Sequence, residues 1–284
     1  MPSGRAPDFI GLGGGRSGTN WLAACIDEHP HASVPVGEVH FFSRDRFVRE
    51  GSGQYEAIFS SCPHGDLVGE CSSSYWASEE APARIASLYP DAKLIISLRD
   101  PIDRAFSQYR NESGSGRIAS DASFLSAFAA RPEYRAGSSH GVNLERYLAY
   151  IPADRMHIMI FEETHADPER ALHDLFLFLG LDPDVPIPSA CVRVNESAIS
   201  RSTAFARAIA WGSGILKRPR LIGLWRFLQA SGIASFLKSL NAYPEAPGSR
   251  SPSSSDRAAL LPIFLSDIGR IETFLGRSLP SWRA

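Results

Sequence analysis

The chain is poor in cysteine, since its 284 residues include only 4. These cysteines, at positions 25, 62, 71 and 191, are scattered. They form neither the C-x-x-C pairing of a zinc site nor the dense framework of a small secreted protein. We therefore expect reduced thiols and no metal site. Cys25 falls on the apolar face of a predicted helix beside Trp21, Leu22 and Ile26, so we expect it to pack in the core.

Long apolar runs and an excess of one charge are also lacking. No stretch reaches the roughly 18 apolar residues of a membrane span, and residues 1–7 lack the apolar centre of a signal peptide. We therefore expect a cytoplasmic protein. The 29 basic and 31 acidic residues give a net charge of -2, which argues against a nucleic-acid partner, so any anion site must be local. The length and the 44% hydrophobic content predict a single domain over residues 1–284.

A glycine-rich loop near the N-terminus is the first candidate anion site. An apolar run at residues 9–12 leads into Gly13-Gly14-Gly15-Arg16-Ser17-Gly18-Thr19, and a helix is predicted over residues 17–28. Glycines allow backbone N–H groups to approach a phosphate, and the helix N-terminus adds unsatisfied donors. The alternative is a strand-to-helix turn that binds nothing.

The loop lacks the lysine and hydroxyl residue of a nucleoside-triphosphatase P-loop. Gly13 and Gly18 fit the G-x-x-x-x-G half of that motif, but Thr19 and Asn20 occupy its Lys and Ser/Thr positions. Arg16 supplies a cation three residues earlier. This pattern favours a phosphate ester bound without a metal over Mg-ATP.

An acid and an imidazole follow in the segment Gly37-Glu38-Val39-His40-Phe41-Phe42. If the segment is extended, Glu38 and His40 project to one side, and Val39 and Phe41 project to the other. Such a pair can share one substrate. Alternatively, both residues are merely exposed on a strand face.

Apolar runs at residues 67–71, 93–98 and 156–161 predict further strands, and helical patterns separate them. A P-loop-like three-layer α/β/α fold with a central parallel sheet accounts for this alternation. Arg99 follows the second of these runs, Asp100 and Pro101 can start the next helix, and Ser107 lies two turns into it. Arg99 and Ser107 can therefore face a ligand at the sheet edge. Residues 72–76 are polar and aromatic, and they line a pocket or form a turn.

Acidic residues are missing between Glu196 and Glu245, where basic and aromatic residues are mixed. We expect residues 198–255 to form a helical basic insertion with a mobile loop, before a closing helix and tail over residues 256–284. The insertion is a lid over an anionic ligand, or residues 204–243 contact a membrane surface or a carrier protein.

These residues carry a resemblance to sulfotransferases that use 3′-phosphoadenosine-5′-phosphosulfate (PAPS). The run Arg16-Ser17-Gly18-Thr19-Asn20-Trp21 is similar to their 5′-phosphosulfate loop, which usually has Lys at the position of Arg16. Arg99 and Ser107 resemble their 3′-phosphate site. The segment 38–42 resembles heparan-sulfate-type members, although Cys71 stands where these have Lys, and residues 275–277 with Trp282 resemble the end of bacterial members.

The resemblance implies sulfuryl transfer to a hydroxyl or amine by metal-free in-line displacement. Glu38 is then the general base, His40 orients the acceptor or is itself the base, and Arg16 stabilises the leaving phosphate. The expected acceptor is a small molecule, a glycan or a carrier-bound intermediate. The donor would be held by Gly15, Arg16, Ser17, Gly18, Thr19, Asn20, Trp21, Arg99 and Ser107, and the acceptor by Phe42, Glu70, Ser73 and Tyr75.

Two other functions compete with this reading. A kinase-like P-loop enzyme is weakened by Thr19 and Asn20. A non-catalytic nucleotide-binding module is less consistent with the presence of both Glu38 and His40.

Overall fold

The computed structural model describes residues 4–35, 37–43, 46–60, 62, 66–119, 121–191 and 251–284. The chain divides into two compact units. The first contains residues 1–104, 135–194 and 260–284, and the second contains residues 105–134 and 195–259. The predicted basic insertion at residues 198–255, with its contact segment 204–243, lies outside the described residues except for residues 251–255. Its role, and the single-domain organisation, stay predictions.

The first unit contains a five-stranded parallel sheet in the order β2-β3-β1-β4-β5. The strands are β1 (Phe9–Gly13), β2 (Ala32–Ser33), β3 (Leu67–Cys71), β4 (Lys93–Leu98) and β5 (Met156–Ile160). The predicted strands at residues 67–71 and 93–98 are confirmed in full. The arrangement confirms the predicted α/β class and the central parallel sheet.

Glycine allows the central strands to approach closely. A Cβ on Gly13 would stand 2.2 Å from the carbonyl oxygen of Ser97 in β4, and a Cβ on Gly11 would stand 2.3 Å from Sγ of Cys71 in β3. Real Cβ contacts are never this short, so these β1 positions require glycine. The glycines therefore bring the end of β1, where the loop begins, directly against its neighbours.

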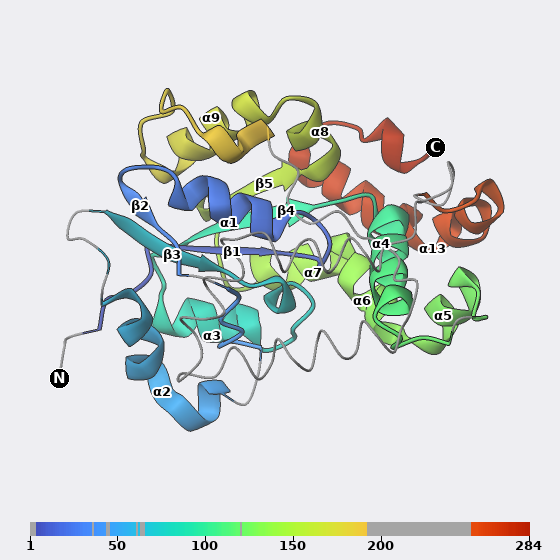
Figure 1. Cartoon of the computed structure of the whole chain (residues 1–284), viewed down its shortest axis with the longest axis horizontal. Helices are drawn as coiled ribbons and strands as arrows, with labels where there is room; N and C mark the ends of the chain where they lie inside the picture. The colour runs from blue at the N-terminus through green and yellow to red at the C-terminus, as the bar shows by residue number, and fades with distance from the viewer. Residues whose placement is uncertain are drawn as a thin grey trace, which may run out of the picture. The chain divides into compact units, whose positions relative to one another are not determined.

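Helices cover both faces of the sheet, as Figure 1 shows. On one face lie α1 (Thr19–Asp27), α8 (Phe161–Ala166) and α9 (Pro168–Leu179), and on the other lie α3 (Ala81–Leu88) and α7 (His140–Leu148). Cys25 is fully buried in the core between α1 and the sheet, which confirms its predicted packing role. The remaining helices of the described chain are α2 (Arg46–Glu56), α4 (Pro101–Gly114), α5 (Phe124–Ala130), α6 (Pro132–Ser138) and α13 (Ser254–Leu275).

Two helix boundaries follow the chemistry of their capping residues. Oδ1 of Asp100 accepts the backbone N–H groups of Ile102 at 2.9 Å and Asp103 at 2.8 Å, so α4 begins where predicted. Asp167 caps α9 in the same way, and Gly180 ends that helix in the left-handed conformation at φ 82°.

Aromatic rings hold the described part of the second unit together. Phe106 contacts Phe124 with ring centroids 5.1 Å apart, and Phe128 stacks on Tyr134. The Tyr134 hydroxyl donates to Glu112 at 2.8 Å, and Arg131 pairs with the same carboxylate at 3.1 Å. Phe106 and Glu112 therefore tie α4 into the packing of this unit.

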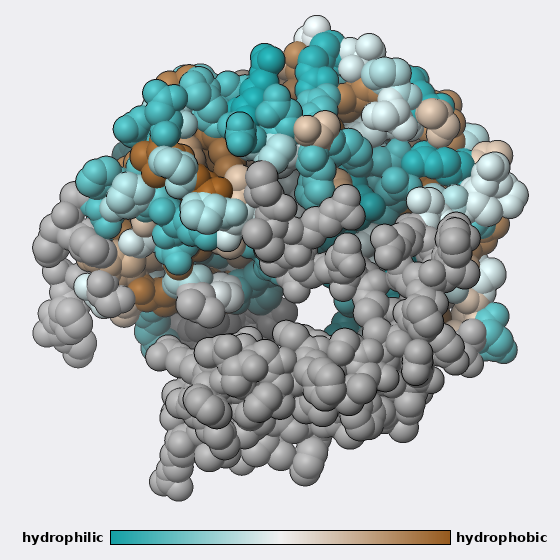
Figure 2. Space-filling view, turned by 45° about the horizontal axis from the view of Figure 1, so that its top comes forward, coloured by the Kyte–Doolittle hydropathy of each residue, from teal (hydrophilic) through white to brown (hydrophobic). Residues whose placement is uncertain are grey.

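The surface in Figure 2 is largely hydrophilic outside the grey residues, with smaller hydrophobic areas between. The exposed large apolar residues Val48, Tyr150 and Leu177 belong to different segments of the chain. Among the helices described, none is both long and apolar enough to cross a membrane.

Candidate functional site

The loop between β1 and α1 adopts an unusual backbone conformation. Arg16 has φ 79° and Gly18 has φ 90°, both in the left-handed region. This conformation is uncommon for a residue with a side chain, so the fold holds Arg16 there at a cost. A Cβ on Gly18 would also stand 3.2 Å from the Phe161 ring. The loop therefore needs glycine at position 18 for both its conformation and its space.

Three consecutive carbonyl groups of the loop are held by donors from β4, from α4 and from Arg99 between them. Nη1 of Arg104 donates to Gly15 O at 3.1 Å, and Nη1 of Arg99 donates to Arg16 O at 3.4 Å. The hydroxyl of Ser97 donates to Ser17 O at 2.5 Å.

In a trans peptide the N–H points opposite to the C=O. Fixing these carbonyls therefore directs the following N–H groups to the other side of the loop. Among them, the N–H of Ser17 turns back to Gly14 O at 3.1 Å. The N–H groups of Arg16 and Gly18 thus belong to the face of the loop that an anion can approach.

Two buried polar atoms at this loop have no hydrogen-bond partner within the described part of the chain. They are Oγ of Ser17 and Nε of Arg99. Ser17 has no exposed surface. Buried donors without partners are rare because each costs free energy, so these two atoms can donate to an anion bound at the loop. Helix α1 also starts without a side-chain cap and has no acidic residue in its first turn. These features suit an anion at the helix N-terminus.

Arg99 is positioned by a buried histidine. Nε2 of His140 lies 2.8 Å from Arg99 O, and Nε1 of Trp76 lies 3.1 Å from Nδ1 of His140. An indole can only donate, so Nδ1 accepts and Nε2 carries the proton that bonds Arg99 O. Burial lowers the pKa of His140 to about 3, so the ring is neutral. The Arg99 guanidinium lies over the Phe161 ring, 4.6 Å from its centroid.

Glu38 and His40 lie together beyond β3. Nε2 of His40 is 3.3 Å from Oε2 of Glu38, with side chains 24% and 22% exposed respectively. The same oxygen accepts the backbone N–H of Ser73 at 3.1 Å and its hydroxyl at 2.7 Å. None of these contacts involves the second oxygen, Oε1. The Glu38 carboxylate is therefore fixed through one oxygen.

The way in which Glu38 and His40 meet differs from the predicted extended segment. Residues 38–40 are not in a strand, and His40 has φ 56°, a left-handed conformation. The turn is held because the backbone N–H groups of Val39 and His40 both donate to Oγ of Ser72 at 3.0 Å. The prediction that Glu38 and His40 lie together is thus correct, but the extended backbone from which it was made is not.

Ser73 joins the acid to the glycine loop. While its hydroxyl bonds Glu38, Oγ lies only 3.9 Å from the position of a Cβ built on Gly15. The Glu38 carboxylate and the glycine loop are thus neighbours within the first unit. This neighbourhood is the main geometric feature of the site.

Three of the four predicted acceptor-binding residues are buried rather than exposed to a cleft. Phe42, Glu70 and Tyr75 have no exposed surface, and only Ser73 is partly exposed. The prediction that these three residues touch an acceptor directly is therefore corrected, since their side chains have no exposed surface. The segment 72–76 forms the turn η2 (Ser73–Tyr75), the second of its two predicted roles.

The other predicted donor-binding residues differ in exposure. Thr19 is buried, and Asn20 is exposed. Trp21 is 7% exposed, and its Nε1 donates to Ala190 O at 3.2 Å. Ser107 lies on the part of α4 that belongs to the second unit, so its pairing with Arg99 stays a prediction.

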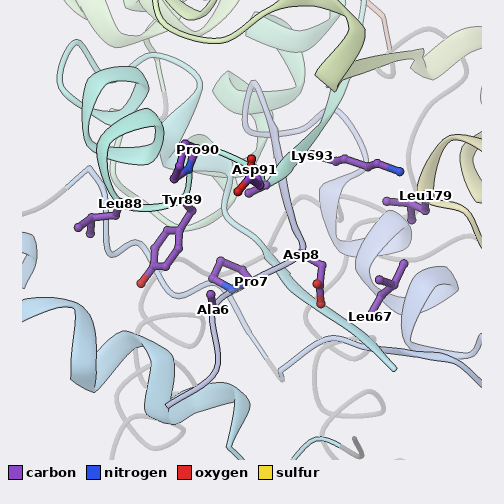
Figure 3. Close-up of a pocket in the computed structure, with 11 residues that line it drawn as sticks. Ala6, Pro7, Asp8, Leu67, Leu88, Tyr89, Pro90, Asp91, Lys93 and Leu179 are labelled. Carbon is purple, nitrogen blue, oxygen red and sulfur yellow. The ribbon is translucent and has the colours of Figure 1, made fainter. Parts of the chain in front are cut away.

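A cavity of about 390 Å³ lies at the opposite end of the strands. Figure 3 shows Asp8, Leu67 and Lys93 around it. These residues stand at the amino ends of β1, β3 and β4, whereas ligands of open parallel sheets bind at the carboxyl ends. Lys93 is already used, because Nζ donates to Phe178 O at 2.6 Å. Elsewhere, the described residues include no cluster of three or more His, Cys, Asp or Glu side chains suited to a metal ion.

Sequence reasoning missed Arg104, His140 and Ser97. Arg104 is 1% exposed, although it lies only five residues after Arg99 in a helix that starts at Pro101. An arginine on the buried side of that helix was a usable signal. His140 comes from α7, far from Arg99 in the sequence, and no local sequence pattern identifies it as a site residue.

The fold and the loop together define a P-loop-like α/β/α protein with a carboxylate and an imidazole close to its glycine loop. Residues 74–185 match a family model described as the sulfotransferase family. The human bifunctional heparan sulfate N-deacetylase/N-sulfotransferase 3 is 33% identical over 199 residues, covering 63% of this chain and 23% of that protein. The mouse heparan sulfate glucosamine 3-O-sulfotransferase 3A1 is 30% identical over 187 residues, covering 63% and 47%.

A solved structure extends the similarity to the whole fold. The sulfotransferase from Alicyclobacillus acidocaldarius has a TM-score of 0.70 at 22% identity and covers 98% of this chain and 99% of its own. The chain spans about a quarter to a half of the length of the two curated relatives. These matches support a relationship to the sulfotransferase family, carried by residues 74–185 and by the aligned part of the relatives.

Proposed function

We propose that the protein transfers a sulfuryl group from PAPS to a hydroxyl or amine of a small-molecule, glycan or carrier-bound acceptor. The observation that carries the proposal is the link through Ser73, which places Glu38 beside the glycine loop. The relatives support both acceptor atoms, because one is named an N-sulfotransferase and another a 3-O-sulfotransferase.

The loop fits the donor's phosphates. Oγ of Ser17 and Nε of Arg99 have no hydrogen-bond partner among the described residues, so both can donate to an anion. The side chains of Arg16 and Arg99 supply positive charge. In this proposal Gly15 to Asn20 bind the 5′-phosphosulfate, and Trp21 stacks on the adenine. Arg99 and Ser107 bind the 3′-phosphate.

Glu38 is the proposed general base. PAPS supplies an activated sulfuryl group whose transfer leaves 3′,5′-adenosine bisphosphate. Because Ser73 and His40 hold Oε2, the other oxygen Oε1 is available to take the proton from the acceptor hydroxyl or amine. The loop N–H groups and Arg16 then stabilise the charge that develops on the leaving phosphate, without a metal ion.

His40 has the second role in this proposal. Nδ1 lies 2.7 Å from the Ser74 hydroxyl, which is 2.6 Å from the Ser43 hydroxyl. These hydroxyls orient the imidazole so that Nε2 faces Glu38. His40 therefore holds the base in place and orients the acceptor.

The test is formation of 3′,5′-adenosine bisphosphate from PAPS in the presence of hydroxyl and amine acceptors, including glucosamine-containing oligosaccharides and phenols. The proposal expects one bisphosphate for each sulfated acceptor. Magnesium-dependent ATP hydrolysis would instead support a kinase-like enzyme. Binding of the bisphosphate with no turnover for any acceptor would support a nucleotide-binding module.

A further inference from the structure

The buried acid Glu70 occupies a place that the proposed chemistry does not use. It lies in β3 with no exposed surface, on the sheet face opposite to that of its neighbour Cys71. Three hydroxyl groups donate to it: Tyr75 at 2.5 Å, Ser72 at 2.6 Å and Tyr55 at 3.4 Å. A fully buried carboxylate with this set of donors is costly to assemble and needs a purpose.

Two of these hydroxyl oxygens also accept hydrogen bonds from the segment that carries the proposed general base. Oγ of Ser72 accepts the N–H groups of Val39 and His40 at 3.0 Å, and the Tyr75 hydroxyl accepts the N–H of Phe41 at 2.8 Å. Three consecutive N–H groups are thus bound by hydroxyls whose own protons point to Glu70. No regular strand or helix would otherwise hold this turn.

The direction of each O–H bond depends on the ionised Glu70 carboxylate, which can accept hydrogen bonds but cannot donate them. A hydroxyl has one proton, and when that proton goes to a carboxylate its lone pairs face away and can accept N–H groups. A carboxamide or a protonated acid at position 70 would donate to one hydroxyl. That hydroxyl would then lose an acceptor site that the segment 39–41 needs.

We infer that Glu70 is a positioning residue, which holds Glu38 and His40 in their reactive arrangement through the hydroxyls of Ser72 and Tyr75. This inference rests on the proposed roles of Glu38 and His40. It fits the left-handed φ of 56° at His40, because the backbone torsions of His40 set the direction of the Phe41 N–H relative to that of His40, and these two groups donate to different hydroxyls, those of Tyr75 and Ser72. It also explains why Glu70 and Tyr75 are buried instead of lining an acceptor site.

Glu70 is the charged group of this network, because the three phenols around it stay neutral. Tyr55, Tyr75 and Tyr147 face it from α2, η2 and α7, and burial raises the pKa of each phenol, so all three stay neutral. Glu38 is the other acid facing it, and it adds repulsion. Burial raises the pKa of Glu70 to about 7, while the hydroxyl bonds oppose this change. The carboxylate form therefore prevails above neutral pH.

The test compares Glu70→Gln and Ser72→Ala with a matched control, Tyr55→Phe. The control also removes one hydroxyl that donates to Glu70, but within the described part of the chain this hydroxyl makes no hydrogen bond to the segment 39–41. We expect amide hydrogen exchange at residues 39 and 40 to be about 5-fold or more faster in the first two variants, the scale of the roughly 1 kcal/mol that a neutral hydrogen bond contributes. The control should stay within about 2-fold, as should amides of β4 in all three.

The same variants separate positioning from general destabilisation. In Glu70→Gln and Ser72→Ala we expect kcat to fall by about 10-fold or more, with the affinity for 3′,5′-adenosine bisphosphate unchanged. If Glu70→Gln does not fold, Ser72→Ala against Tyr55→Phe decides. Equal exchange rates at residues 39 and 40 in those two variants would overturn the inference. Faster exchange in Glu70→Gln and Ser72→Ala, together with a wild type that never turns over PAPS, would support the positioning role of Glu70 and refute the proposed function.

Discussion

The most informative substitution in the donor site is Arg99→Ala. In the structure the guanidinium makes one long bond, at 3.4 Å to Arg16 O, while Nε has no partner among the described residues. A phosphate at this site would therefore add charge-assisted bonds to a guanidinium that otherwise makes this long bond and a contact with the Phe161 ring. Each such bond contributes about 1.5 to 3 kcal/mol. We thus expect 3′,5′-adenosine bisphosphate to bind about 10- to 150-fold more weakly to the variant.

The ligand itself supplies the control. Adenosine 5′-monophosphate lacks the 3′-phosphate, so its affinity should change by less than about 2-fold in Arg99→Ala. Arg155→Ala is a matched arginine variant, because its guanidinium bonds Ala92 O near the amino ends of the strands. It should bind both nucleotides normally. Isothermal titration calorimetry that shows equal losses for both nucleotides would mean that Arg99 acts only by holding the loop, and unchanged affinities would refute the assignment.

Three further predictions concern the base, the loop and the buried acid. Glu38→Gln should lower kcat by about 100- to 10,000-fold with bisphosphate affinity retained. If His40→Ala abolished turnover and Glu38→Gln did not, their roles would be reversed. Gly18→Ala should lower the free energy of unfolding in urea by about 1 to 3 kcal/mol, since Gly18 has φ 90° and the new methyl would crowd the Phe161 ring. The pKa of Glu70 rises from its ordinary 4.5 to about 7, so folded protein binds this proton more tightly. Stability relative to Glu70→Gln should therefore fall by about 3 kcal/mol as pH rises from 4.5 to 7, and a flat difference in urea titrations would contradict this.

Local patterns in the sequence were enough to predict most of the sheet. β3 and β4 were predicted in full because buried parallel strands are continuous apolar runs, and the start of α4 was predicted from its Asp100 cap and Pro101. These signals are local, so neighbouring residues carry them. The short strand β2 was only seen as an extended stretch, because its two residues show no periodicity.

The site required information that is not local. Glu38 and His40 were paired correctly, but the turn at His40 depends on Ser72, more than thirty residues away. The burial of Glu70 was also hidden, since an acid in a strand usually predicts an exposed position. Two of its donors, Ser72 and Tyr75, follow it within five residues, but the third, Tyr55, comes from α2 and only the folded chain brings it in.

Transfer of labelled sulfate from PAPS tests the central claim most directly. The wild type, Glu38→Gln and Arg99→Ala would each be incubated with radiolabelled PAPS and the same panel of hydroxyl and amine acceptors. The account predicts a labelled acceptor and an equal amount of 3′,5′-adenosine bisphosphate with the wild type, and strongly reduced transfer with both variants. Equal transfer by the wild type and Glu38→Gln, or no transfer to any acceptor by a wild type that binds the bisphosphate, would contradict it.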